Sequence, residues 1–341
     1  MFEAMRAADI LKLTPAGLYC EAGDFYVDPV RKVARAVITH GHSDHARAGH
    51  ATVLATTETL AVMAERYGQK FAGATQAARF GETLTLGEAR VTLRPAGHVL
   101  GSAQVVVDAP GGRVVVSGDY KRARDPTCPP FEPVPCDVFV TEATFGLPVY
   151  RHPPVEHEIA KLLHSLALFP ERAHLVGAYS LGKAQRLIAV LREAGYRDAV
   201  FIDRAVARLC GVYAAHGVDL GSLAPLEEQA PEALAGRIAI GAPSAHADLF
   251  AACAAEPVTS FASGWMRVRK RARAGGGELP LVISDHADWD ELTATVRDVA
   301  PRELWITHGA EDALMHWAKS NGIAARPLAI AGYGDEEDAP A

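Results

Sequence analysis

The chain has 341 residues, of which 49% are apolar and 22% are charged, and its net charge is −7. This composition is that of an ordinary globular protein, long enough for two domains or for one core with an insertion. No stretch approaches the roughly 18 apolar residues of a membrane span, and the N-terminus lacks the layout of a secretory signal. The five cysteines are scattered without a C-x-x-C pair, which favours thiols in a reducing cytoplasm over disulfides or a thiolate zinc site.

The first predicted strand of interest, residues 33–38, leads directly into a cluster of polar side chains. Residues 39–45 read THGHSDH, and their metal-capable members are His40, His42, Asp44 and His45. A divalent metal explains why rings that repel one another when protonated are gathered here, because zinc prefers imidazole and carboxylate where no thiolate is offered. Strand alternation places His40 and His42 on one side, and the turn after them can direct Asp44 and His45 to a second position. A run of solvated loop histidines is the alternative.

The next predicted elements are a helix over residues 56–66 and two strands that end near further metal-capable side chains. His98 follows the strand-like run 90–93, and Asp119 ends the strand-like run 113–119. A single histidine after a strand is usually structural. Recurrence of such residues at strand ends indicates a shared site.

The pattern then changes to helices and strands that alternate, beginning with an amphipathic helix over residues 157–168. The strand-like run 173–178 ends in a small-residue turn that opens a helix. Because the free amides and the dipole of a helix N-terminus favour an anion, we expect Ser180, Gly182 and Lys183 to contact substrate. A helix cap and a tight turn are the plain alternative for Ser180 and Gly182.

Two segments without a regular pattern follow. Residues 221–235 are rich in Pro, Ala and Glu and are predicted to form an exposed connection. Residues 267–273 hold five cations in seven positions, led by Arg267 and Arg269. Such a run can contact backbone phosphates, the sequence-independent part of nucleic-acid affinity. A solvated helix face is the alternative.

The last predicted elements are a strand at residues 281–283, a helix at 289–299 and a strand at 303–307 that leads into His308. With His98 and Asp119, this histidine completes a set of ligands delivered by four apolar runs. Two metals about 3.5–4 Å apart, bridged by one carboxylate, would use the whole set and would suit phosphodiester or ester hydrolysis.

The motif H-x-H-x-D-H at residues 40–45, with His98 and Asp119, resembles the metallo-β-lactamase superfamily. Further segments resemble the three motifs of its β-CASP nuclease group, namely TEATFG at 141–146, ISDHAD at 283–288 and THG at 307–309. The stretches TPAGLYC at 14–20, GDFYVDP at 23–29, FGLPVY at 145–150 and SGWMRVR at 263–269 are similar to the bacterial ligase-associated DNA exonucleases.

The resemblance implies a mixed α/β (α+β) fold, an αββα metallo-β-lactamase sandwich with an inserted α/β β-CASP cap. The expected parts are the first part of the core at 1–149, the cap at 150–278, the return of the core at 279–330 and a disordered acidic tail at 331–341.

The resemblance also implies a role for each matching position. Two zinc ions, which manganese can replace, would be held by two sets of ligands that share Asp119: His40, His42 and His98 for one, and Asp44, His45 and His308 for the other. The water bridging the metals would attack phosphorus.

The same resemblance makes Asp44, Asp119, Glu142 and His286 the expected catalytic residues. His286, oriented by Glu142, would be the general acid, since a carboxylate beside an imidazole favours the protonated ring. A buried carboxylate that only accepts backbone hydrogen bonds is the alternative for Glu142.

The resemblance to the DNA exonucleases implies a two-metal phosphodiesterase that degrades DNA from an end, in DNA repair. The alternative is an RNA-processing β-CASP ribonuclease, which His308 in the third motif favours. A non-catalytic scaffold is opposed by the filled ligand positions, and a small-molecule hydrolase by the cap and the basic run. The expected partner is nucleic acid, DNA more than RNA; a DNA ligase or helicase follows from the resemblance only, and no membrane is expected.

Overall fold

The computed structural model describes residues 6–242, 256–268 and 277–329, which form two compact units. The first holds the described residues up to Pro148 and from His286 onward, and the second holds those of Val149–Asp285. The predicted acidic tail at 331–341 and Arg269 lie outside the described residues. The roles of core and cap expected for the two parts stay predictions. Within the described ranges, no helix combines the length and apolar character needed to cross a membrane.

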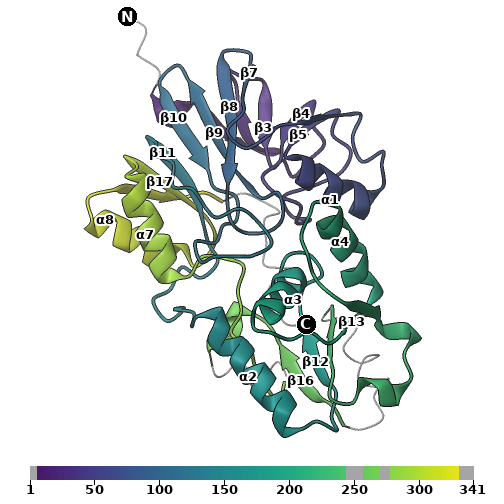
Figure 1. The fold of residues 1–341 in the computed structure, drawn as a ribbon. Coiled ribbons are helices and arrows are strands. Elements are labelled where there is room, and N and C mark those ends of the chain that lie inside the picture. The colour runs from purple at the N-terminus through teal and green to yellow at the C-terminus, as the bar shows by residue number, and fades with distance from the viewer. Residues whose placement is uncertain (1–5, 243–255, 269–276, 330–341) are drawn as a thin grey trace, which may run out of the picture. The chain divides into compact units, whose positions relative to one another are not determined.

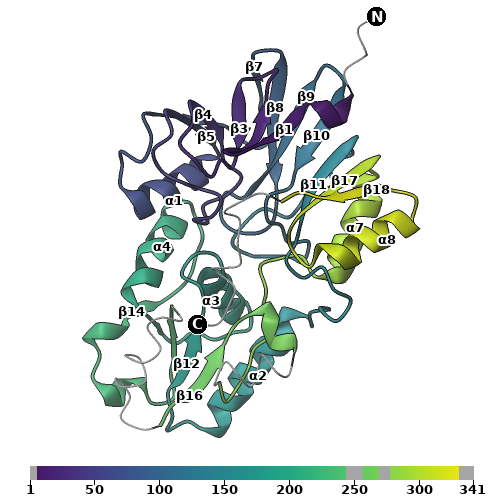
Figure 2. The ribbon, with the colours of Figure 1, turned by 180° about the vertical axis from the view of Figure 1, so that it is seen from behind.

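Two sheets form the centre of the first unit (Figures 1 and 2). The first sheet has the order β1 (Leu11–Thr14), β2 (Gly17–Cys20), β3 (Phe25–Val27), β4 (Arg35–Val37), β5 (Thr52–Ala55), β6 (Ala74–Ala77). The second has the order β18 (Ala324–Pro327), β17 (Glu303–Gly309), β11 (Val138–Ala143), β10 (Gly112–Val116), β9 (Ala103–Ala109), β8 (Ala89–Pro95), β7 (Thr83–Leu86). A short 3-10 helix, η1 (Ala7–Asp9), precedes β1.

An apolar core fills the space between these two sheets. Along β9, Val105 and Val107 belong to this core, whereas Val106 packs on the opposite face, as the period of two along a strand requires. Helices α7 (Trp289–Val299) and α8 (Glu311–Ser320) cover the outer face of the second sheet, and α1 (Thr57–Tyr67) covers the outer face of the first. The order helix, sheet, sheet, helix confirms the predicted αββα sandwich.

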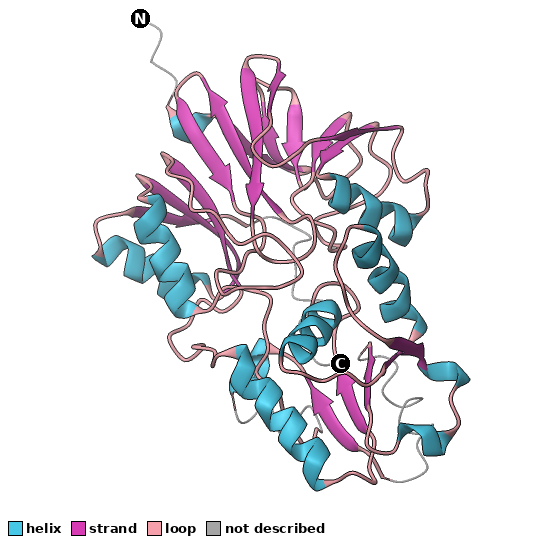
Figure 3. Ribbon diagram, viewed as in Figure 1, coloured by secondary structure: helices cyan, strands magenta, loops and turns pink. Residues whose placement is uncertain are grey.

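The second unit is built on a parallel sheet of five strands (Figure 3). The order is β14 (Leu223–Pro225), β13 (Val200–Ile202), β15 (Ile238–Gly241), β12 (His174–Gly177), β16 (Val258–Phe261). The helices are α2 (Val155–Leu168), α3 (Lys183–Glu193) and α4 (Arg204–Ala215), with the 3-10 turns η2 (Leu226–Glu228), η3 (Pro231–Leu234) and η5 (Gly264–Arg267). Every residue of β12, β13 and β15 is buried, as expected for parallel strands covered on both faces.

The structure confirms three predicted helices and corrects two other assignments. The helices predicted at 56–66, 157–168 and 289–299 are α1, α2 and α7. The predicted strand at 281–283 is wrong, because only Leu281 pairs, through an isolated bridge to Ala262. The connection predicted at 221–235 contains the edge strand β14, where Pro225 is tolerated because one side of an edge strand needs no partner.

Gly309, next to His308 at the end of β17, provides a test of the packing between β17 and β11. Its φ is +77°, and a Cβ on it would lie 2.3 Å from the carbonyl oxygen of Ala143. Gly322 has a φ of +78° with nothing within 4 Å of the same position, so it is a matched control. We expect Gly322→Ala to lower the free energy of unfolding by about 1–2 kcal/mol, the cost of the left-handed backbone alone. Gly309→Ala should cost about 3–4 kcal/mol, since the backbone has to move as well.

Denaturant unfolding of the two variants measures this difference. Equal losses in both would contradict the view that close approach of β17 to β11 requires glycine at position 309.

Candidate metal centre

The topology of the second sheet brings several polar side chains to one edge. Strands β8 and β10 both run antiparallel to β9, and β10, β11 and β17 are parallel, so these four strands end at the same edge. His98 and Asp119 follow β8 and β10, while Glu142 and His308 lie at the ends of β11 and β17. The loop after β4 of the first sheet adds His40, His42, Asp44 and His45.

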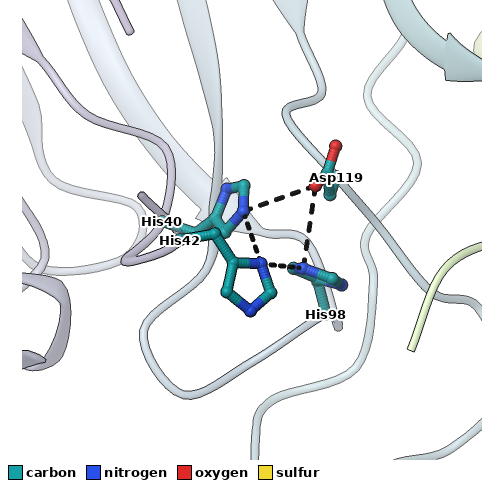
Figure 4. A group of neighbouring side chains, drawn as sticks. All are labelled: His40, His42, His98 and Asp119. Carbon is teal, nitrogen blue, oxygen red and sulfur yellow. Dashed lines mark hydrogen bonds and ion pairs between the residues drawn. The ribbon is translucent and has the colours of Figure 1, made fainter. Parts of the chain in front are cut away.

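Four of these side chains converge in a first group: His40, His42, His98 and Asp119 (Figure 4). His42 Nδ1 lies 3.1 Å from His40 Nε2 and 3.0 Å from His98 Nε2. Asp119 Oδ2 lies 3.4 Å from His40 Nε2 and 3.8 Å from His98 Nε2. Ligands of a tetrahedral zinc, bonded at 2.0–2.2 Å, are about 3.3–3.6 Å apart. The spacing and the donor set therefore fit one divalent cation.

A second group contains Asp44, His45 and His308. Asp44 Oδ2 lies 3.4 Å from His45 Nε2 and 3.9 Å from His308 Nε2. His45 Nε2 also lies 3.5 Å from Asp119 Oδ2, the oxygen that faces the first group. One carboxylate oxygen thus adjoins both groups, which is the geometry of a bridging ligand.

Gly118 allows Asp119 to reach this place. Its φ is +57°, and a Cβ there would lie 2.7 Å from the Cβ of Thr39. Any larger residue would push the loop after β10 away from the segment that carries His40.

Asp28 is a residue of the centre that the sequence patterns did not reveal. It is 1% exposed and accepts hydrogen bonds from Thr39 N at 2.7 Å and Thr39 Oγ1 at 2.5 Å. Its Oδ2 lies 2.8 Å from His45 Nδ1, so it holds that ring with Nε2 toward Asp44 and Asp119. A carboxylate behind a metal-binding histidine fixes its tautomer and orientation. The stretch GDFYVDP at 23–29 contains this aspartate, but the resemblance carried by that stretch assigned it no role.

Burial and neighbouring charges set the protonation of these groups. Burial lowers the pKa of His308. Burial, together with the adjacent His45, also holds the pKa of His40 well below its usual range. Burial opposes ionisation of Asp119, but His45 and His40 outweigh it and hold the carboxyl pKa well below its usual range. Neutral imidazole and ionised carboxylate are the forms that bind metal.

His45 differs from the other rings. Burial alone would lower its pKa, but the carboxylates of Asp44 and Asp119 outweigh burial and raise it to about 10. A cation bound through His45 Nε2 therefore has to replace a firmly held proton.

Glu142 and His286 form a pair beside Asp119. Glu142 is fully buried, its Oε2 lies 3.0 Å from His286 Nδ1, and its Oε1 accepts a hydrogen bond from Tyr120 N at 2.8 Å. The ring centre of His286 lies 4.7 Å from that of His98. The structure therefore brings the expected acid and its orienting carboxylate next to a metal-ligand candidate.

The residues expected to contact substrate lie in the second unit. Gly182 N donates a hydrogen bond to Gln185 Oε1, and Gln185 Nε2 donates one to the carbonyl oxygen of Ser180. Ser180 and Gly182 therefore belong to the turn that starts α3. Lys183 is 1% exposed and its Nζ lies 3.1 Å from Asp285 Oδ1. Arg267 is exposed in η5. Substrate contact by these residues stays a prediction.

Asp28→Asn tests the role of the hidden carboxylate. The amide nitrogen cannot accept from His45 Nδ1, so the ring is expected to carry its proton on Nε2, which blocks that ligand atom. We expect affinity for one metal equivalent to fall by about 10- to 100-fold, with the other retained. Metal titration against a chelator of known affinity measures this.

Asp24→Asn is the matched control. Asp24 also has a positive φ, +48° against +41° for Asp28, but it is exposed, and its Oδ1 accepts a hydrogen bond from Tyr19 Oη at 2.9 Å. Full metal affinity in Asp28→Asn, or an equal loss in Asp24→Asn, would contradict the assignment.

Comparisons with known proteins agree with this geometry. The family model described as the metallo-beta-lactamase superfamily matches residues 17–175. A "Probable DNA ligase" of Opitutus terrae is 28% identical over 91% of this chain, which covers 30% of that protein. "Endoribonuclease ysh1" of Aspergillus fumigatus is 35% identical over 33% of this chain and 13% of its own length. The chain thus spans a third or less of the length of these relatives.

A solved structure shares the fold. The "Crystal Structure of a Protein of Unknown Function from Enterococcus faecalis V583" has a TM-score of 0.57 at 14% identity, covering 86% of this chain and 79% of that one. The family match and the histidine–aspartate groups lead to one conclusion: the chain carries a metallo-β-lactamase domain at residues 17–175, and the proteins similar to it include ones named as a probable DNA ligase and as endoribonucleases.

Proposed function

We propose that this chain is a metal-dependent nuclease that hydrolyses phosphodiester bonds and acts as an exonuclease on DNA. One observation carries the proposal: Asp119 Oδ2 lies 3.4, 3.5 and 3.8 Å from Nε2 of His40, His45 and His98. A carboxylate oxygen between two ligand groups suits a pair of divalent cations, zinc or manganese, held by both groups.

In this proposal His40, His42 and His98 hold one cation, Asp44, His45 and His308 hold the other, and Asp119 is shared. Bound metal supplies Lewis acidity toward the phosphate and a water of lowered pKa. The chain's own contribution is to fix the ligands, which Asp28 does for His45 and Thr39 does for His40 through a 3.0 Å contact to Nδ1.

His286 is proposed as the general acid for the leaving oxygen. Its Nδ1 is engaged by Glu142, so the transferable proton is the one on Nε2. Both oxygens of Glu142 have partners, Tyr120 N and His286, which keeps the ring in one orientation. Asp44 and Asp119 act through the cations that they hold.

DNA is supported as the substrate by a match that extends over most of the chain. The relative named "Probable DNA ligase" is similar to this chain over 91% of its length, so a segment of this kind occurs within a protein named for joining DNA. A role in DNA repair, a ligase or helicase partner and a cytoplasmic location belong to the same proposal. No disulfide joins the cysteines within the part of the chain that the structure describes.

RNA is the second candidate substrate. "Endoribonuclease ysh1" and "Cleavage and polyadenylation specificity factor subunit 3-I" of Arabidopsis thaliana are 35% and 32% identical to this chain, each over 33% of its length. Those matches support RNA chemistry for the shared part.

The proposal is tested with single-stranded DNA and RNA of one sequence, labelled at either end, competing for zinc- or manganese-loaded protein. Asp119→Asn, which removes one shared carboxylate oxygen, is the blank. Stepwise DNA degradation absent from the blank is expected, and the label lost first gives the polarity. Preferential RNA cleavage would favour the second candidate, and no cleavage of either would contradict the proposal.

His286→Ala tests the proton transfer separately. We expect kcat on an oligonucleotide to fall by about 10²- to 10⁴-fold, because the leaving alkoxide then departs without a proton. Hydrolysis of bis(p-nitrophenyl) phosphate should change far less, since its phenolate leaves unprotonated. Metal content is the control: loss of metal equal to that of Asp119→Asn would contradict an acid role.

A further inference from the structure

The segment 281–285 precedes His286 and has little regular structure of its own. After the bridge between Leu281 and Ala262, side chains of two helices contact the segment. Glu158 of α2 accepts a hydrogen bond from Val282 N at 2.8 Å. From α3, Arg186 Nη1 donates to the carbonyl of Ser284, and Lys183 Nζ lies 3.1 Å from Asp285 Oδ1.

These helix side chains are charged and almost completely buried. The exposed fractions of Glu158, Lys183 and Arg186 are 4%, 1% and 2%, and that of Asp285 is 3%. Burying a charge is costly unless it is paired and hydrogen-bonded. The contacts with the segment supply such partners, and Glu158 has Lys161 as its ion-pair partner in addition. Lys183 Nζ lies in addition 4.7 Å from the ring centre of Tyr179, a favourable place for a cation.

We propose that Glu158, Lys183 and Arg186 form a buried charged clamp that positions His286 for proton transfer. The inference rests on the proposed function, in which His286 is the acid. The clamp holds the chain at positions 282, 284 and 285, and Glu142 holds the ring of the next residue. Lys183 is thereby a positioning residue, since a side chain that is 1% exposed and paired with Asp285 does not reach a phosphate in solution.

The consequence is kinetic. A displacement of about 1 Å of a reacting group can cost about 10²-fold in rate. Loosening the clamp should therefore lower the rate of the step that needs the proton of His286, with little change in substrate affinity. A phosphate contact by Lys183 would produce the opposite pattern, a raised KM.

The main variant is Lys183→Met with Asp285→Asn, which removes both charges so that neither is left buried without its partner. The control is Arg172→Met with Glu278→Gln, which removes in the same way an ion pair that is 2.6 Å long and 18% and 48% exposed. Both proteins are loaded with zinc and assayed on an oligonucleotide and on bis(p-nitrophenyl) phosphate, beside His286→Ala.

We expect the main variant to lose about 10- to 100-fold in kcat on the oligonucleotide. KM, metal content and hydrolysis of bis(p-nitrophenyl) phosphate should stay within about threefold of wild type, as in the control. A raised KM at unchanged kcat would overturn the inference in favour of a phosphate contact. Equal losses on both substrates would overturn it in favour of a purely structural role.

Glu158 gives a second route if the double variant does not fold. Glu158→Gln keeps an oxygen acceptor for Val282 N and should restore most of the oligonucleotide activity lost in Glu158→Ala. Equal activity of the two would overturn the clamp. Equal losses of activity on the two substrates in His286→Ala would contradict the acid role, and with it the role of the clamp. If only the clamp variants behave otherwise than expected, the acid role of His286 still stands.

Discussion

The arrangement of this site depends on the carboxylate of Asp119, whose Oδ2 lies within 3.8 Å of ring nitrogens of His40, His45 and His98. The histidines arrive from two different loops, and their donor atoms converge on one buried oxygen, an arrangement suited to binding cations. The two-sheet sandwich satisfies this constraint because β8, β10, β11 and β17 end at one edge, while the loop after β4 approaches from the facing sheet. Gly118 and Asp28 then serve the same purpose, the first by allowing close approach to Thr39 and the second by orienting His45.

Much of this was predictable because the signals are local. Apolar runs that end in metal-capable residues predicted the strands before His98 and His308, and the helix at α7 follows from its spacing and from the cap at Asp288. Asp28 was missed because one aspartate after a three-residue strand has no pattern, although in space it bonds Thr39 and His45. The strand predicted at 281–283 failed for a related reason: Val282 N is bonded by Glu158, which is 124 positions away in the sequence. The local sequence around residues 281–283 does not indicate that a distant side chain takes up this backbone amide.

The second unit contains charged side chains whose burial cannot be predicted from the hydropathy of the sequence. Lys183 at the start of α3 suggested an anion contact, yet its ammonium is buried against Asp285 and Tyr179. A charged residue on a predicted helix is normally taken to be solvated, because burial of a charge requires a partner that is distant in sequence. Here that partner, Asp285, immediately precedes the proposed acid His286 in the sequence.

The most direct test of the central role of Asp119 is a crystal structure of the zinc-loaded protein with anomalous diffraction data collected at the zinc absorption edge. Two peaks about 3.5–4 Å apart are expected, with the Asp119 carboxylate between them. The ligands of one should be His40, His42 and His98, and those of the other Asp44, His45 and His308. A single peak, or a second metal held by Glu142 and His286 in place of His45 and His308, would contradict it.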